Sequence, residues 1–215
     1  MRTNDLIDML ATGASLEQAG DPWRRLVYAI GSGALVSTIL MVKAIPVNPD
    51  ITNAIQLAAF WQKLGFAAAI AAVALLMVFR LSRPGVRLGN VFPALMVPIL
   101  AIWILAGIAL ATAEPEERAS LFFGNTWKVC PFLITMLATP VFAASFWAMR
   151  DLAPTNLRLA GAAAGLFSGA VGAVVYCFHC PELAAPFIAF WYLLGILIPT
   201  VAGFIGTSIS TGALA

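Results

Sequence analysis

Six long apolar stretches constrain what this chain can fold into. Each reaches roughly the 20 residues that an α-helix needs to cross about 30 Å of hydrocarbon. They cover residues 25–43, 62–79, 91–112, 130–149, 158–178 and 185–206. Backbone N–H and C=O groups in lipid must be paired within their own segment, so these stretches are predicted to be helices. With 61% hydrophobic and 10% charged residues, the predicted fold class is an all-α integral membrane bundle of six transmembrane helices.

The Lys and Arg residues predict which ends of the helices face the cytoplasm, because cytoplasmic loops favour these residues. One side of the bundle would carry Arg2, Arg24, Arg25, Arg80, Arg83, Arg87, Arg150 and Arg158, and the other Lys43, Lys63, Arg118 and Lys128. Both termini are therefore predicted to be cytoplasmic. The expected organisation is a cytoplasmic segment over residues 1–24, the bundle over 25–206 and a cytoplasmic tail over 207–215.

Several function classes are disfavoured. No Asp, Glu, Lys or Arg lies in the middle of a predicted span, whereas transporters usually keep ionisable groups along their path. The loops are too short to enclose a catalytic pocket, and the sequence has no phosphate-binding glycine loop, catalytic triad or basic nucleic-acid stripe. We therefore expect no enzyme activity, no cofactor and no direct contact with nucleic acid, and we expect membrane lipid as a partner.

Small residues and prolines within the spans indicate how the helices pack. Gly161, Gly165 and Gly169 repeat at four-residue spacing in the fifth span, which lets a neighbouring helix approach closely. Prolines lack the backbone N–H that a helix interior uses, so they are expected to bend their spans. They are Pro93, Pro98, Pro140 and Pro199.

The leader before the first span has the pattern of a short helix. Thr3 or Asn4 can cap it, and Leu6 and Leu10 share one face. A helix this short is marginal alone in water, so it needs a surface to pack on. That surface is either a protein partner or the membrane interface, and a frayed tail is the third alternative.

Two cysteines, Cys130 and Cys180, each precede a proline at the start of a span on the same predicted side of the membrane. Proline suits the first turn of a helix, where free amide groups and the helix dipole favour a thiolate. Lys128 and His179 are candidate auxiliary residues beside the two thiols. The pattern therefore predicts exposed, reactive thiols that form a disulfide or bind metal, although free cysteines are also common as small packing residues.

Cys177 leaves two further alternatives open. With Cys180 it forms Cys-x-x-Cys, a weak signal in this position. A quinone-linked membrane thiol oxidoreductase would use this pair, but it also needs a second pair for electron relay and the chain has only one more cysteine. A zinc or soft-metal set could combine Cys130, Cys177 and Cys180 with His179, although adjacent ligands make this awkward.

Several segments together resemble one protein family. They are Thr3-Asn4-Asp5-Leu6-Ile7, Gly124-Asn125-Thr126-Trp127-Lys128-Val129-Cys130-Pro131, Leu152-Ala153-Pro154-Thr155 and His179-Cys180-Pro181-Glu182, with Phe187 and Trp191-Tyr192. In these the chain resembles the NrsF-type negative regulators of extracytoplasmic-function (ECF) sigma factors, which are six-span bacterial anti-sigma factors.

The resemblance implies an inner-membrane protein that holds an ECF sigma factor inactive at the cytoplasmic face. It also implies that two periplasmic cysteines, Cys130 and Cys180, sense oxidants or heavy metals. Cys177 does not belong to the family pattern. We place sigma binding on the leader from topology, at Asp5, Leu6, Ile7 and Leu10, assisted by Arg80, Arg83 and Arg87. A small-molecule transporter and a structural membrane subunit with incidental cysteines remain as alternatives.

Overall fold

The computed structural model describes residues 22–82, 89–149 and 156–212. Asp5, Leu6, Ile7, Leu10, Arg83 and Arg87, which the sequence assigns to sigma binding, lie outside the described residues.

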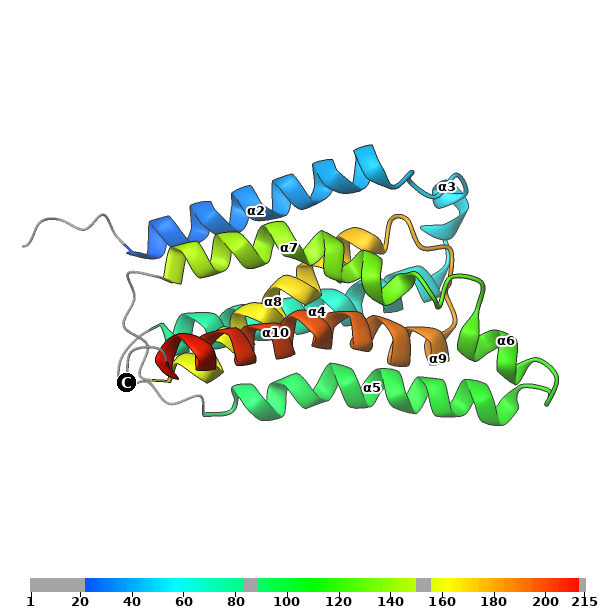
Figure 1. Ribbon diagram of the computed structural model, residues 1–215. Coiled ribbons are helices and arrows are strands. Elements are labelled where there is room, and N and C mark those ends of the chain that lie inside the picture. Colours follow the sequence, from blue (N-terminus) through cyan, green and yellow to red (C-terminus); the bar gives the residue numbers. More distant parts are fainter. Residues whose placement is uncertain (1–21, 83–88, 150–155, 213–215) are drawn as a thin grey trace, which may run out of the picture.

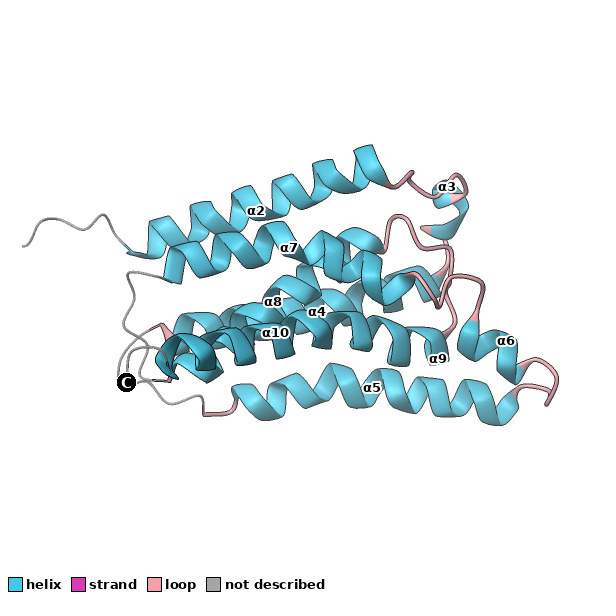
Figure 2. Ribbon diagram, viewed as in Figure 1, coloured by secondary structure: helices cyan, strands magenta, loops and turns pink. Residues whose placement is uncertain are grey.

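In the part of the chain that the structure describes, the secondary structure is helical and contains no strand (Figure 2). The long helices are α2 (Pro22–Ala44), α4 (Ala58–Leu81), α5 (Val91–Thr112), α7 (Cys130–Met149), α8 (Leu157–Tyr176) and α10 (Leu193–Gly212). Short elements are α3 (Ile51–Ala54), α6 (Arg118–Phe123), α9 (Ala185–Phe187) and the π-helix η1 (Ile188–Tyr192), of which α9 and η1 run directly into α10. Within the described residues, six helical segments are long and apolar enough to cross a membrane, which confirms the predicted fold class.

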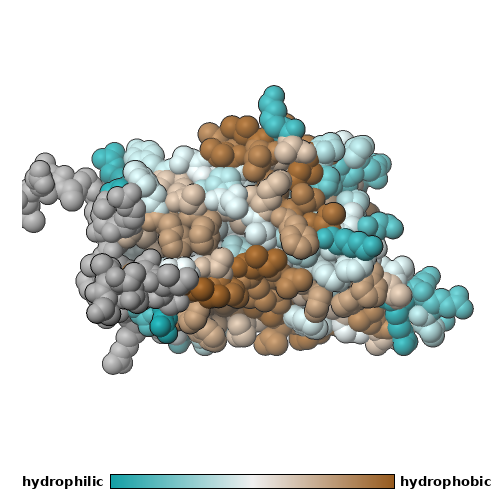
Figure 3. All heavy atoms as spheres, viewed as in Figure 1, coloured by the Kyte–Doolittle hydropathy of each residue, from teal (hydrophilic) through white to brown (hydrophobic). Residues whose placement is uncertain are grey.

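Helix α8 occupies the centre of the bundle (Figure 1). It packs against α10, α4 and α7, while α2 lies on α7 and α5 lies on α4 and α9. We call the end where α2 begins and α10 finishes the terminal end, and the opposite end, with α3, α6 and α9, the α6 end. Hydrophobic side chains cover the middle of the visible face, and hydrophilic ones gather towards the α6 end (Figure 3).

The glycine stripe of α8 lies against α10. A Cβ atom on Gly161 or Gly165 would overlap backbone atoms of α10, and one on Gly169 would lie 2.7 Å from the carbonyl oxygen of Ile196. Side chains at these positions would therefore force the two helices apart. This confirms the close packing predicted from the glycine spacing.

Three of the four prolines lie inside helices, namely Pro98, Pro140 and Pro199. Pro140 cannot donate to the carbonyl of Met136, and the hydroxyl of Thr139 donates to that oxygen instead, at 2.6 Å. Pro93 is different, because it lies in the first turn of α5, where its missing N–H would have had no partner in the helix. The expectation that Pro93 bends its span is therefore wrong.

Candidate functional site: a buried thiol cluster

Three free cysteines lie at the α6 end of the bundle. Cys130 is the first residue of α7, Cys177 directly follows α8, and Cys180 lies in the loop between α8 and α9. Their exposed fractions are 0%, 1% and 2%. The prediction that Cys130 and Cys180 are exposed is therefore wrong.

The segments around Cys130 and Cys180 explain this burial by folding onto one another. The backbone N–H of Asn125 donates to the Glu182 carboxylate at 2.8 Å. Gly124 has a φ of +53°, and a Cβ atom there would lie 2.7 Å from Cδ of Glu182. The Thr126 hydroxyl lies 4.0 Å from Sγ of Cys180. The loop after α8 thus lies over the start of α7, and this keeps solvent away from the helix terminus.

The two Cys-Pro pairs differ in local structure. Cys130-Pro131 opens α7, as the sequence predicts. Cys180-Pro181 does not open a helix, because α9 begins at Ala185 and has its own proline, Pro186, in the first turn. The dipole argument for a thiolate therefore applies to Cys130 only.

The two auxiliary residues named from the sequence have other neighbours. Nδ1 of His179 makes a hydrogen bond to the carbonyl oxygen of Pro46, so this nitrogen carries the proton. The N–H of Asn48 donates to the carbonyl of Phe178 at 3.1 Å, which joins the same loops a second time. Lys128 is exposed, and its Nζ lies 5.5 Å from the ring centre of Trp127.

Lys63 is the cation that the structure places among the thiols. Its side chain is fully buried, and Nζ donates to the carbonyl oxygens of Cys180 at 2.7 Å and Glu182 at 3.1 Å. Sequence reasoning missed this role and counted Lys63 only as a loop charge. A signal was available, because Phe60, Ala67 and Ile70 share the helix face of Lys63 and are buried too.

Two tyrosines complete the cluster. Tyr176 lies at the end of α8, and Tyr192 ends the π-helix η1, a type of turn that is rare and often found at functional sites. Their rings lie 5.7 Å apart, and both hydroxyls are buried against the thiols, with no nitrogen or oxygen partner among the described residues. Cys130 and Cys180 interact electrostatically with each other and with Tyr176, and Cys177 does so with Tyr192.

The environment of Cys177 favours the neutral thiol. Burial raises the pKa of this thiol to about 12, and the nearby Lys63 ammonium opposes the rise. Cys177 therefore stays protonated at neutral pH. This argues against Cys177 as the attacking thiol of an oxidoreductase.

The metal set suggested by the sequence is not assembled. Among the described residues, no group of three or more His, Cys, Asp or Glu side chains is arranged to hold a metal ion. His179, its only non-thiol member, instead faces Pro46.

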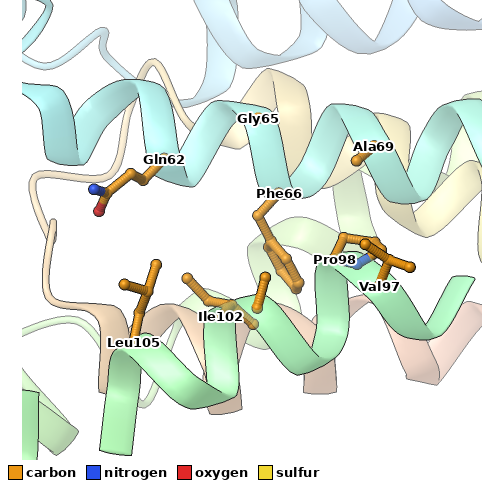
Figure 4. Close-up of a pocket in the computed structure, with 9 residues that line it drawn as sticks. Gln62, Gly65, Phe66, Ala69, Val97, Pro98, Ile102 and Leu105 are labelled. Atoms are coloured by element: carbon orange, nitrogen blue, oxygen red, sulfur yellow. The ribbon is translucent and has the colours of Figure 1, made fainter. Parts of the chain in front are cut away.

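An apolar groove of about 360 Å³ lies between α4 and α5 (Figure 4). Phe66, Pro98 and Ile102 contribute to its lining, and Gln62 is its polar residue. Its lining has no nucleophile, cation or carboxylate, so it offers no chemistry comparable with that of the thiol cluster.

Aromatic side chains surround the α6 end. Phe123 contacts Phe122 and Trp127, and all three rings contact Trp191, whose indole N–H donates to the carbonyl of Phe122 at 2.9 Å. Aromatic rings with a polar handle are typical of the boundary between lipid and water. The thiol cluster therefore lies near that boundary.

Comparisons with known proteins identify the family. Residues 10–209 match the family model NrsF, described as "Negative regulator of sigma F". The chain is 55% identical over 203 residues to the "Probable anti-sigma-F factor NrsF" of Azospira oryzae, covering 94% of this chain and 95% of the relative. It is 39% identical over 201 residues to the "Anti-sigma-F factor NrsF" of Caulobacter vibrioides, covering 92% of each. No solved structure matches. The chain therefore belongs to the NrsF family, whose members are regulatory proteins rather than enzymes.

Proposed function

We propose that this chain is an inner-membrane anti-sigma factor that holds an ECF sigma factor at the cytoplasmic face and releases it when Cys130 and Cys180 are oxidised. Family membership and the names of both relatives support the regulatory role. The observation that carries the release mechanism is the thiol cluster, where residues 50 positions apart are buried together.

The proposed orientation places the terminal end in the cytoplasm and the α6 end in the periplasm. The eight-to-four division of Lys and Arg supports it. The periplasm is oxidising, so a thiol pair facing it suits a redox sensor. The leader before α2 would then lie on the cytoplasmic side. There Asp5, Leu6, Ile7 and Leu10, with Arg80, Arg83 and Arg87, remain the predicted sigma-binding residues.

The proposed chemistry is formation of one disulfide. Two thiols and one peroxide give a disulfide and two waters, so the sulfurs lose two electrons and both thiol protons end in water. A disulfide requires Cα atoms within about 7 Å of each other. Close-packed interiors do not absorb a new bond without movement. Because the thiols are buried, forming the disulfide must shift the residues packed around them.

Helix α7 provides a physical route from Cys130 to the leader. It packs along α2, where the Ser37 hydroxyl donates to the carbonyl of Leu137 at 2.7 Å and a Cβ atom on Gly33 would lie 2.9 Å from Cα of Val141. Towards the terminal end, the Arg25 guanidinium lies 4.2 Å from the ring centre of Trp147. A shift at the start of α7 can thus move α2, and about 1.4 kcal/mol of coupling changes sigma affinity tenfold.

Oxidation fits the site better than capture of a soft metal ion. Thiols are the groups that soft metals prefer. However, the described residues offer no set of three ligands from His, Cys, Asp and Glu. A metal ion bound between two thiols is the second candidate inducer.

A pull-down from detergent-solubilised membranes tests the function. The tagged chain should retain an ECF sigma factor, identified by its peptides, and should lose it after peroxide treatment. Cys130→Ser and Cys180→Ser should each abolish the loss, and the double variant should behave like either single one, because the two residues act as a unit.

Cys177→Ser is the matched control, because it removes a buried thiol from the same cluster and should leave the release nearly unchanged. Release that persists in both single variants would make Cys130 and Cys180 packing residues. Absence of any sigma factor from the untreated complex would reject the proposed function itself.

A further inference from the structure

Lys63 is a buried cation that the proposed release mechanism leaves without a role. Its ammonium donates to the backbone carbonyls of Cys180 and Glu182 and, among the described residues, to no carboxylate. Two of its three donors are satisfied in this way. Within the described residues, the charge is compensated by these carbonyl dipoles and by the ring of Phe60, whose centre lies 5.7 Å from Nζ.

A buried ammonium is costly unless it is paired or well hydrogen-bonded. The thiols of Cys130 and Cys177 lie close enough to Lys63 to interact with its charge. If either thiol loses its proton, the thiolate and the ammonium neutralise each other inside the protein. A neutral donor at position 63 would preserve the loop contacts but would not stabilise this ion pair.

We propose that Lys63 is the counter-cation of the thiol cluster, which stabilises the thiolate that starts oxidation and holds the Cys180 loop against α4. This inference rests on the proposed function, because oxidation by peroxide begins with a thiolate. The thiol proton leaves to solvent hydroxide and forms water. The thiolate sulfur then attacks one oxygen of the peroxide and the O–O bond breaks. This yields a sulfenic acid and hydroxide, and a second thiol displaces the sulfenic oxygen as water to form the disulfide.

Other polar groups around the thiols do not supply a positive charge. The titratable groups that face the thiols are Cys130 from α7, Tyr176 from α8, Tyr192 from η1, Lys63 from α4, and Cys177 and Cys180 from the loop. The carboxylate of Glu182 accepts from Asn125, and the ring of His179 faces Pro46. Lys63 is therefore the positive group directed at this cluster within the described residues.

The test is the pH dependence of thiol alkylation in the purified full chain. Wild type, Lys63→Gln, Lys63→Met and Lys63→Arg are treated with iodoacetamide across a pH series, and modification of each cysteine is quantified by mass spectrometry. For Cys130 and Cys177, the alkylation rate at each pH of the series should fall roughly tenfold or more in the Gln and Met variants, because the opposite charge that favours the thiolate is lost. Lys63→Arg keeps the charge and should stay near wild type.

Lys128→Gln is the control, because it removes an exposed cation close in sequence to Cys130 and should change nothing. Lys63→Gln and Lys63→Met both remove the charge at position 63. One of them that is monodisperse in detergent is enough to decide the test. An unchanged alkylation rate in a folded neutral variant, or an equal fall in Lys63→Arg, would overturn the role of the charge. Because alkylation is measured without a sigma factor, this result is independent of the pull-down. If the neutral Lys63 variants alkylate like wild type but sigma release still depends on Cys130 and Cys180, the role of Lys63 is rejected and the proposed function stands.

Discussion

At the scale of single residues, the thiol cluster combines groups that are each unusual inside a membrane protein. Cys130, Cys177 and Cys180 are buried next to the hydroxyls of Tyr176 and Tyr192, which have no nitrogen or oxygen partner among the described residues. Buried polar groups without partners are rare in native structures, and they occur at sites of strain or function. Their gathering at one end of the bundle favours function, because packing alone would be served by apolar side chains.

The turn at Gly124 is the residue-scale feature that a substitution can test most directly. Its φ of +53° suits glycine, and a Cβ atom would collide with the Glu182 carboxylate, which the N–H of Asn125 binds. Gly124→Ala should therefore lower the free energy of unfolding by about 1–3 kcal/mol, measured by thermal denaturation in detergent. It should also make Cys180 easier to alkylate, because the loop that covers it loosens.

Gly107→Ala is the matched control, since a Cβ atom there meets nothing within 4 Å. It should be neutral or slightly stabilising. Equal stability of the two variants would mean that the contact between residues 124 and 182 contributes nothing to covering the thiols.

Burial of the thiols could not be predicted from the sequence, although their pairing could. The Cys-Pro repeat places both residues at the same end of the bundle, and the structure brings them together. Whether they are exposed depends on the loop after α8 folding over the start of α7. That contact spans 57 residues, and no local pattern encodes it.

At the scale of helices, the bundle is organised by small residues rather than by amphipathic faces. In a membrane the outer surface is as apolar as the core, so hydrophobic periodicity does not reveal which face of a helix is buried. This explains why the sequence predicts the six spans to within four residues at each end but does not predict the order of their packing. The glycine stripe of α8 was the exception, because a requirement for close approach is visible in the sequence.

The contact between α8 and α10 should be sensitive to a single methyl group. Gly165→Ala places a Cβ atom against the carbonyl of Pro199, a backbone atom that cannot rotate away. We expect a loss of roughly 1–3 kcal/mol, as for other overpacked interiors, measured as a lower midpoint of thermal denaturation. Gly31→Ala, where a Cβ atom meets nothing within 4 Å, is the control. A Gly165→Ala protein as stable as the control would show that the two helices can separate at little cost.

At the scale of the whole molecule, the proposed mechanism requires a sensor at one end and a binding segment at the other. The thiol cluster lies at the α6 end, and α2 begins at the terminal end, where α10 also finishes. An even number of spans brings both chain ends to one side. The direction in which this molecule sits in the membrane is therefore decisive for the sensor model.

Labelling with an impermeant maleimide tests this orientation, and burial dictates its design. The native thiols are buried and should react only slowly with a bulky charged maleimide, so the wild-type chain serves as the background. Glu116→Cys adds an exposed thiol in the loop before α6, and Leu157→Cys adds one at the start of α8. In intact spheroplasts Glu116→Cys should be labelled and Leu157→Cys should not, and both should be labelled after lysis. The reverse pattern would place the thiol cluster in the cytoplasm, where disulfides rarely persist, and the proposed redox switch would fail.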